Sequence, residues 1–125
     1  MKYSFIIPVY NRPDEVDELL DSLTRQTFRD FEVIVVEDGS SDPCKEVVEK
    51  FEKVLDVHYY NKANSGPGQT RNYGVEQAQG EYMLILDSDC ILPATKSMKN
   101  VATVNIIEQI FRFSFSIGML LILRN

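Results

Sequence analysis

The chain has 125 residues, of which 44% are hydrophobic and 26% charged, so it suits one globular domain and is too apolar for a disordered segment. Its formal net charge of -6 argues against a nucleic-acid-binding protein, which would present a basic surface. The two cysteines, Cys44 and Cys90, have no metal-binding spacing, and no signal peptide precedes the first apolar stretch. These features together predict a reducing, cytoplasmic setting.

The first third of the chain predicts a strand, a helix and a second strand. Residues Tyr3–Val9 are β-branched and aromatic, as in a strand, and a turn with Pro13 at the first helical position follows. The helix is expected to end before Thr27. A second strand is predicted at Glu32–Val36, followed by an acidic loop at Glu37–Asp42. The helix should bury one apolar face, formed by Val16, Leu19, Leu20 and Leu23.

The middle of the chain repeats this alternation. Asp42 is predicted to be the N-cap of a second helix, with Pro43 at its first position and an inner face of Val47, Val48 and Phe51. A short strand at Val57–Tyr60 and a glycine-containing loop then lead into a third helix, expected to end near Ala78. Gly80 is predicted to form the C-terminal turn of that helix.

The stretch Tyr82–Leu86 is apolar throughout and runs directly into Asp87, Ser88 and Asp89. Such a run predicts a strand that is buried on both faces of a mostly parallel sheet. Strands that alternate with helices predict an α/β fold with right-handed crossovers. Three loops should therefore gather at one edge of the sheet, namely Tyr10–Pro13, Glu37–Asp42 and Asp87–Asp89.

This predicted edge carries side chains that suit a nucleoside diphosphate. Asp87 and Asp89 could hold Mg²⁺ or Mn²⁺ together with substrate phosphates, although an Asp-x-Asp sequence can also be a polar turn that caps a helix. Arg71 could bind phosphate or a base carbonyl, or could be an exposed helix residue. Asp38 could accept a hydrogen bond from a base N–H, Asp87 could accept bonds from ribose hydroxyls, and Tyr10 could stack on the base ring.

The chain resembles family 2 glycosyltransferases, which are inverting enzymes that use nucleotide-activated sugars. The resemblance lies in SFIIPVYNRPDEVDELLDSLTRQTFRDFEVIVVEDGSSD and NSGPGQTRNYGVEQAQGEYMLILDSDC, which cover about the first ninety-two residues in order and spacing. It implies the GT-A fold, a Rossmann-like, open and mostly parallel sheet with flanking helices. Glu37 departs from the aspartate that is frequent in the family.

The resemblance also implies roles for particular residues. Asp38 would contact the base, and Asp87 and Asp89 would be the two carboxylates of the Asp-x-Asp motif, with Asp89 on a Mg²⁺ or Mn²⁺ ion. The residues that would flank the nucleobase or lie near the nucleotide are Pro8, Val9, Tyr10, Gly66, Arg71 and Asn72.

The resemblance stops after Leu92, where the composition also changes. Residues 1–92 carry 9 Lys and Arg against 18 Asp and Glu, whereas residues 93–125 carry 4 against 1. We therefore expect a nucleotide-diphospho-sugar-binding domain at residues 1–92 and an atypical apolar tail at residues 93–125, truncated after the Asp-x-Asp strand. Glu108 is the only acidic residue of the tail, and nothing around it matches the general base that family members use.

The tail itself permits several interpretations. Lys96–Gln109 could form a helix, and Phe111–Ile117 alternates apolar and polar residues as a strand does. The charge-free run Phe113–Leu123 is shorter than the ~20 residues of a transmembrane helix. The alternatives are a peripheral membrane contact, a truncation and an out-of-frame end.

The leading hypothesis is a glycosyltransferase of cell-surface polysaccharide or glycolipid synthesis, of which this chain is the donor-binding half. A UDP-sugar is the expected donor, and the acceptor would be a glycan or a lipid-linked glycan. The alternatives are a non-catalytic nucleotide-binding or partner-binding remnant and a purely structural domain. The expected location is cytoplasmic, and membrane association through the tail is an alternative that the sequence leaves open.

Overall fold

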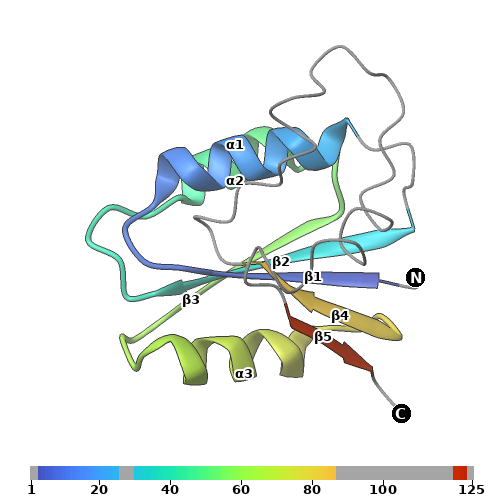
Figure 1. The fold of residues 1–125 in the computed structure, drawn as a ribbon. Helices are drawn as coiled ribbons and strands as arrows, with labels where there is room; N and C mark the ends of the chain where they lie inside the picture. Colours follow the sequence, from blue (N-terminus) through green and yellow to red (C-terminus); the bar gives the residue numbers. More distant parts are fainter. Residues whose placement is uncertain (1–2, 26–29, 87–119, 124–125) are drawn as a thin grey trace.

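The protein forms an α/β sheet structure in a computed structural model that describes residues 3–25, 30–86 and 120–123 (Figure 1). Strands and helices alternate along the chain up to β4, as predicted. In chain order the elements are β1 (Tyr3–Val9), α1 (Pro13–Thr24), β2 (Phe31–Asp38), α2 (Lys45–Phe51), β3 (Val57–Lys62), α3 (Pro67–Gln77), β4 (Tyr82–Ile85) and β5 (Leu120–Leu123).

The five strands form one sheet in the order β3-β2-β1-β4-β5. The pairs β1–β2, β1–β4 and β2–β3 are parallel, and β5 pairs antiparallel with β4. The predicted mostly parallel α/β fold is therefore confirmed. Because β1 to β4 run in the same direction, the segments that follow them leave the sheet at one common edge.

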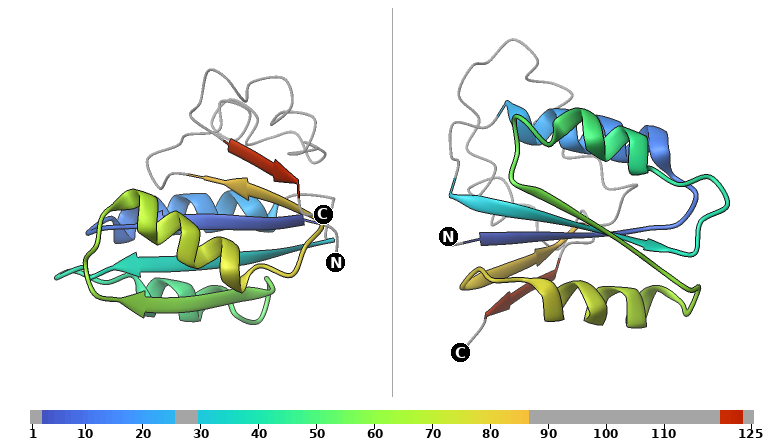
Figure 2. Two further views of the ribbon diagram at one scale, coloured as in Figure 1. Left: turned by 90° about the horizontal axis from the view of Figure 1, so that it is seen from below. Right: turned by 180° about the vertical axis from the view of Figure 1, so that it is seen from behind.

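The helices cover both faces of the sheet: α1 and α2 lie on one face and α3 lies on the other (Figures 1 and 2). Alternate residues of each strand point to opposite faces of the sheet and pack in the cores on those two faces. Phe5 and Ile7 belong to the core cluster under α1 and α2, whereas Ile6 belongs to the cluster under α3. At Gly74 of α3, an added Cβ would lie 2.5 Å from Cγ2 of Ile6, so this glycine allows the helix to approach β1 closely.

Both β2 and β3 extend further than predicted toward the common edge. The prediction ended them at Val36 and Tyr60, but Glu37 still pairs with Asn61, and Asp38 with Lys62. The ladder therefore continues through polar residues that sequence propensity assigns to a loop. As a result, Glu37 and Asp38 are strand residues, and their side chains point to opposite faces of the sheet.

The predicted start of the second helix at Asp42 and Pro43 is wrong, because α2 begins at Lys45 and Cys44 is its N-cap. The backbone N–H of Cys44 donates to the carboxylate of Glu37, seven residues earlier. The backbone N–H of Asp42 donates to Oδ1 of Asn11 at 2.9 Å. These contacts hold residues 41–44 outside the helix.

The predicted role of Gly80 is also wrong. Helix α3 ends at Gln77 with Ala78 as its C-cap, and Gly80 lies instead against β1. An added Cβ at Gly80 would lie 2.8 Å from the carbonyl carbon of Tyr3, and its N–H donates to Oγ of Ser4 at 2.8 Å. Gly80 therefore allows the connection into β4 to pass close to the central strand.

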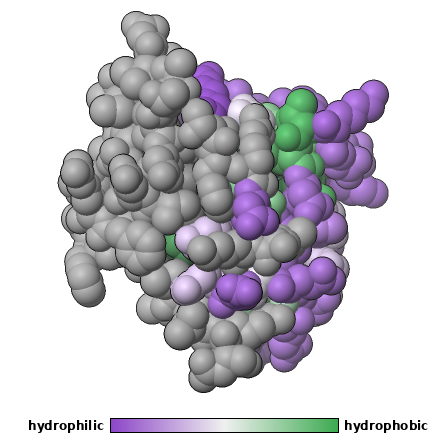
Figure 3. Space-filling model, turned by 90° about the vertical axis from the view of Figure 1, so that its right-hand side faces the viewer, coloured by the Kyte–Doolittle hydropathy of each residue, from purple (hydrophilic) through white to green (hydrophobic). Residues whose placement is uncertain are grey.

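The edge at which the parallel strands begin is mainly hydrophilic over the described part of the surface (Figure 3). Nε2 of His58 lies 3.0 Å from the carboxylate of Asp56 and 3.8 Å from that of buried Glu32.

The expected helix Lys96–Gln109 and strand Phe111–Ile117 lie outside the described residues. Among the helices that the structure describes, none has the length and hydropathy of a membrane span.

Candidate functional site

A hollow of about 600 Å³ lies at the edge where the parallel strands end. Three chain segments form it: the end of β1 with the turn after it, the last residue of β2, and the loop that leads into α3 together with the start of that helix. The lining residues are Pro8, Val9, Tyr10, Arg12, Asp38, Asn64, Gly66, Pro67, Thr70 and Arg71. We call this hollow the edge pocket.

Most of the residues predicted to bind nucleotide line the edge pocket. They are Pro8, Val9, Tyr10, Asp38, Gly66 and Arg71. Asn72 is exposed on α3 and is not among the lining residues. Asp87 and Asp89, the predicted metal ligands, lie outside the described residues. Four further residues line the pocket and were not predicted, although each lies within two positions of a predicted residue: Arg12, Asn64, Pro67 and Thr70.

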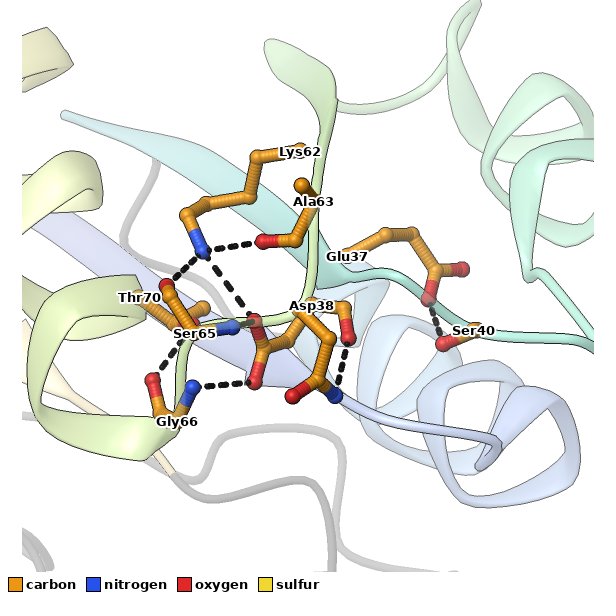
Figure 4. Close-up of polar contacts among 9 residues, drawn as sticks. Glu37, Asp38, Ser40, Lys62, Ala63, Ser65, Gly66 and Thr70 are labelled. Atoms are coloured by element: carbon orange, nitrogen blue, oxygen red, sulfur yellow. Dashed lines mark hydrogen bonds and ion pairs between the residues drawn. The ribbon is translucent and has the colours of Figure 1, made fainter.

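The carboxylate of Asp38 connects β2 to the loop before α3 (Figure 4). Its Oδ1 accepts hydrogen bonds from Nζ of Lys62 at 3.0 Å and from the N–H of Ser65 at 2.8 Å. Its Oδ2 accepts from the N–H of Gly66 at 3.1 Å, and its backbone carbonyl accepts from Nδ2 of Asn64 at 2.9 Å. One side chain thus fixes two walls of the edge pocket relative to each other.

Asp38 is a charged acceptor in this wall. Burial raises the pKa of its carboxyl, but the hydrogen bonds from Ser65, Lys62, Thr70 and Gly66 lower it more, and the net pKa lies below the ordinary aspartate value. The carboxylate is therefore ionised at neutral pH. An ionised carboxylate accepts hydrogen bonds and donates none, so the pocket presents an acceptor here.

Glu37 connects the loops after β1 and β2 on the other side of the strand. It is fully buried, and its carboxylate accepts hydrogen bonds from the hydroxyl of Ser40 and the N–H of Cys44 (Figure 4 shows the Ser40 bond). Oγ of Ser40 accepts in turn from the N–H of Asn11 at 2.9 Å. This chain of contacts fixes the turn that carries Tyr10, whose side chain stays 52% exposed at the pocket.

The turn after β1 depends on an unusual backbone conformation. Asn11 has a φ of 53°, in the left-handed region that asparagine adopts more readily than most residues. Its side-chain Oδ1 accepts from the N–H of Asp42 at 2.9 Å and from the hydroxyl of Ser41 at 3.3 Å. The turn therefore has a specific shape, and the loop after β2 supports it.

The model of the family described as "Glycosyl transferase family 2" matches residues 4–104 of this chain. The chain belongs to glycosyltransferase family 2. The poly(ribitol-phosphate) beta-N-acetylglucosaminyltransferase TarS of Staphylococcus aureus is 43% identical to it over 93 residues. That match covers 71% of this chain but only 16% of TarS, so the chain spans a small part of the length of its curated relatives.

Solved structures of two glycosyltransferases share the fold. The crystal structure of S. aureus TarS 1–349 in complex with UDP-GlcNAc has a TM-score of 0.68 and 44% identity, over 71% of this chain and 27% of that chain. The mannosyltransferase PcManGT of Pyrobaculum calidifontis, in complex with GDP-Man and Mn²⁺, has a TM-score of 0.68 and 28% identity. That match covers 79% of this chain and 30% of the PcManGT chain. The predicted GT-A fold is thereby confirmed.

Proposed function

We propose that this chain binds a nucleoside diphosphate sugar in the edge pocket and is the donor-binding part of an inverting glycosyltransferase. The observation that carries the proposal is the grouping of Tyr10, Asp38 and Arg71 around one pocket at the carboxyl edge of a parallel sheet. The proposed reaction belongs to the synthesis of cell-surface polysaccharide or glycolipid. The free thiol of buried Cys44 fits a reducing location, and we propose that the chain acts in the cytoplasm.

Each pocket residue has a proposed contact with the nucleotide. The exposed ring of Tyr10 can stack on the base, and the Asp38 carboxylate can accept from a ring N–H. Uracil and guanine, the bases of the ligands named for TarS and PcManGT, both carry such an N–H. Arg71 and Arg12 supply positive charge for phosphate at the same pocket. Pro8, Val9, Gly66 and Asn72 are proposed to adjoin the nucleotide.

We propose that Asp87 and Asp89 hold a Mg²⁺ or Mn²⁺ ion beside the diphosphate. Asp87 directly follows Leu86, which is buried and whose N–H donates to the carbonyl of Ile6 at 2.8 Å, and Asp89 follows two residues later. The described chain thus reaches the edge pocket's side of the sheet one residue before Asp87. Carboxylate oxygens suit these hard cations, and a bound cation would neutralise charge on the departing diphosphate.

Calorimetric titration of the chain with UDP tests this proposal. We expect binding in the presence of Mn²⁺ and an affinity at least about tenfold lower, or about 1.4 kcal/mol weaker, with a chelator. Asp89→Asn should remove that metal dependence, whereas Glu49→Gln, on the exposed side of α2, should retain it. Equal affinity with and without metal would exclude the metal site. Failure of UDP and GDP alike to bind would exclude the proposed function.

A non-catalytic nucleotide-binding domain is the second candidate, and the edge pocket with its Asp38 acceptor fits it equally well. An acceptor hydroxyl reacts slowly until a general base takes its proton, a contribution of typically ~10²–10⁴ in rate. We therefore expect the 125-residue chain alone to bind nucleotide, to hydrolyse a donor sugar slowly and to transfer none to an acceptor. Robust transfer from a panel of nucleotide sugars would contradict this, and Glu108 would then be the first residue to substitute.

A further inference from the structure

Lys62, the last residue of β3, directs its ammonium group at the carboxylate of Asp38 (Figure 4). Nζ of Lys62 donates to Oδ1 of Asp38 at 3.0 Å, to the carbonyl of Ala63 at 2.8 Å and to the hydroxyl of Ser65. An ammonium group has three N–H donors, so all three have partners. The side chain of Lys62 is only 17% exposed and that of Asp38 only 8%, so the ion pair is largely shielded from water.

The sheet itself places these two charges together. Asp38 and Lys62 are direct partners in the parallel ladder between β2 and β3, and they form its last described pair. This register fixes the distance between the two backbones, whichever rotamers the side chains adopt. The lysine therefore acts on a carboxylate whose backbone position is already set.

Among the described residues, Oδ2 of Asp38 has fewer donors than Oδ1. A carboxylate offers about four lone-pair sites, and Lys62, Ser65 and Gly66 fill three of them. The hydroxyl of Thr70 also lies beside the carboxylate and lowers its pKa, but it donates to the carbonyl of Gly66 at 2.8 Å. Because Asp38 lines the edge pocket, a ligand there can donate to Oδ2 while Thr70 keeps its bond to Gly66.

We infer that Lys62 is a positioning residue that sets which nucleobases the edge pocket accepts, because it fixes the carboxylate of Asp38 in one orientation as an acceptor. The inference rests on the proposed function. Uracil presents a ring N–H that such an acceptor binds, whereas the matching ring nitrogen of cytosine is itself an acceptor. A fixed anionic acceptor therefore favours uracil over cytosine, although the two bases have nearly the same size.

Without Lys62, Asp38 keeps its bonds from Ser65 and Gly66 but loses one donor to Oδ1 and its neighbouring cation, so its carboxyl group takes up a proton more readily. A protonated carboxyl group can donate to the ring nitrogen of cytosine as well as accept from uracil. The loss of Lys62 should therefore reduce discrimination between the two bases. A lysine that only supports the loop would instead change affinity for both bases by the same factor.

The test is calorimetric titration of the full chain and its variants with UDP and CDP in the presence of Mn²⁺. We expect the unaltered chain to prefer UDP, and Lys62→Met to reduce the UDP-to-CDP affinity ratio by roughly tenfold. Lys62→Arg keeps the charge and should retain most of the ratio. Lys50→Met is the matched control, because Lys50 forms an exposed ion pair with Asp17 at 3.0 Å on α1 and does not line the pocket.

A pH series gives a second readout. In Lys62→Met, protonation of Asp38 should weaken UDP binding at a higher pH than in the unaltered chain, because the cation that favours the ionised form is absent. If Lys62→Met does not fold, as judged by thermal unfolding, Lys62→Gln keeps a donor without the charge and gives the same readouts. An unchanged UDP-to-CDP ratio in a folded, UDP-binding variant would overturn the inference. Failure of the unaltered chain to bind any nucleoside diphosphate would instead overturn the proposed function.

Discussion

Glu37 and Asp38 are adjacent carboxylates at the end of β2, yet their surroundings differ in almost every respect. Glu37 shares the face covered by α1 and α2, is fully buried and joins two loops through Ser40 and Cys44. Asp38 lies on the face covered by α3 and lines the edge pocket. The alternation of side chains along a strand separates the two roles. Neighbouring acidic residues in a sequence motif therefore need not belong to the same site.

The partners of the two carboxylates also differ in charge. Within the described part of the chain, Glu37 has no ion pair, whereas Asp38 has Lys62 at 3.0 Å. Burial, and after it the proximity of Glu37, raises the pKa of the Cys44 thiol and of the Tyr59 hydroxyl, so both groups stay neutral. Neutral donors thus surround a structural carboxylate, and a cation accompanies the one at the pocket.

Replacement of Glu37 should have the largest effect on stability. Glu37→Ala leaves the N–H of Cys44 and the hydroxyl of Ser40 without their acceptor, and each unsatisfied buried group costs about 1–3 kcal/mol. We expect the free energy of unfolding to fall by about 3 kcal/mol in urea denaturation. Glu49→Ala, at an exposed position of α2, should change it by less than about 0.5 kcal/mol. Similar losses in both variants would mean that Glu37 does not hold the loops.

Replacement of Asp38 should affect ligand binding more than stability. Asp38→Ala should weaken UDP binding in calorimetry by roughly 1.5–3 kcal/mol, the range for a hydrogen bond to a charged group. Asp42→Ala is the control, because the described structure gives its side chain no hydrogen bond and excludes it as a helix N-cap. Asp42→Ala should change the free energy of unfolding by less than about 0.5 kcal/mol. A larger binding loss for Asp42→Ala than for Asp38→Ala would contradict the placement of the pocket.

The pH dependence of stability should show that Asp38 is ionised in the folded state. The pKa of Asp38 in the folded state lies below the ordinary value of about 3.9. Its ionised carboxylate therefore stabilises the folded state fully above about pH 4, and this stabilisation is lost as the pH falls through the folded pKa. Asp38→Asn should therefore be less stable than the unaltered chain at pH 7, and the gap should narrow below about pH 4. Urea unfolding at a series of pH values measures the gap, and a constant gap down to pH 3 would contradict the prediction.

The smallest effect is expected at Asn11, which links the loops that follow β1 and β2. Asn11→Ala removes the acceptor of the Asp42 N–H and places alanine at a φ of 53°. We therefore expect it to lower the free energy of unfolding by about 1 kcal/mol in urea denaturation. Asn11→Gly loses the same acceptor but adopts this φ without strain. It should cost less than Asn11→Ala. Equal costs would assign the effect to the hydrogen bond alone.

Composition and periodicity were enough to predict most of the fold. The strand at Tyr3–Val9 and the helix that begins at Pro13 have the predicted bounds, because local propensity and burial agree there. The ends of β2 and β3 were missed because their last pairs are polar and exist only through cross-strand pairing. The start of α2 was missed because the N–H of Cys44 donates to the carboxylate of Glu37, seven residues earlier, which no helix pattern indicates.

The candidate site was predictable where strand ends and the family resemblance coincide. Tyr10, Asp38 and Arg71 reach one pocket because parallel strands end at a common edge. Lys62 could not be identified in this way, since its contact with Asp38 depends on the register between β2 and β3. Asn72 follows Arg71 directly, but one residue of a helix turns the side chain by about 100°, and it is exposed.

The position of β3 at the end of the sheet has a consequence for association between copies of the chain. Among the described strands, β3 has a hydrogen-bonded neighbour on one side only, so its other row of backbone groups can template a further strand. Charged residues protect such strands from aggregation, but the lysine of β3, Lys62, is only 17% exposed and is paired with Asp38. The edge of β3 therefore lacks an exposed lysine, and concentrated preparations should associate through this strand first.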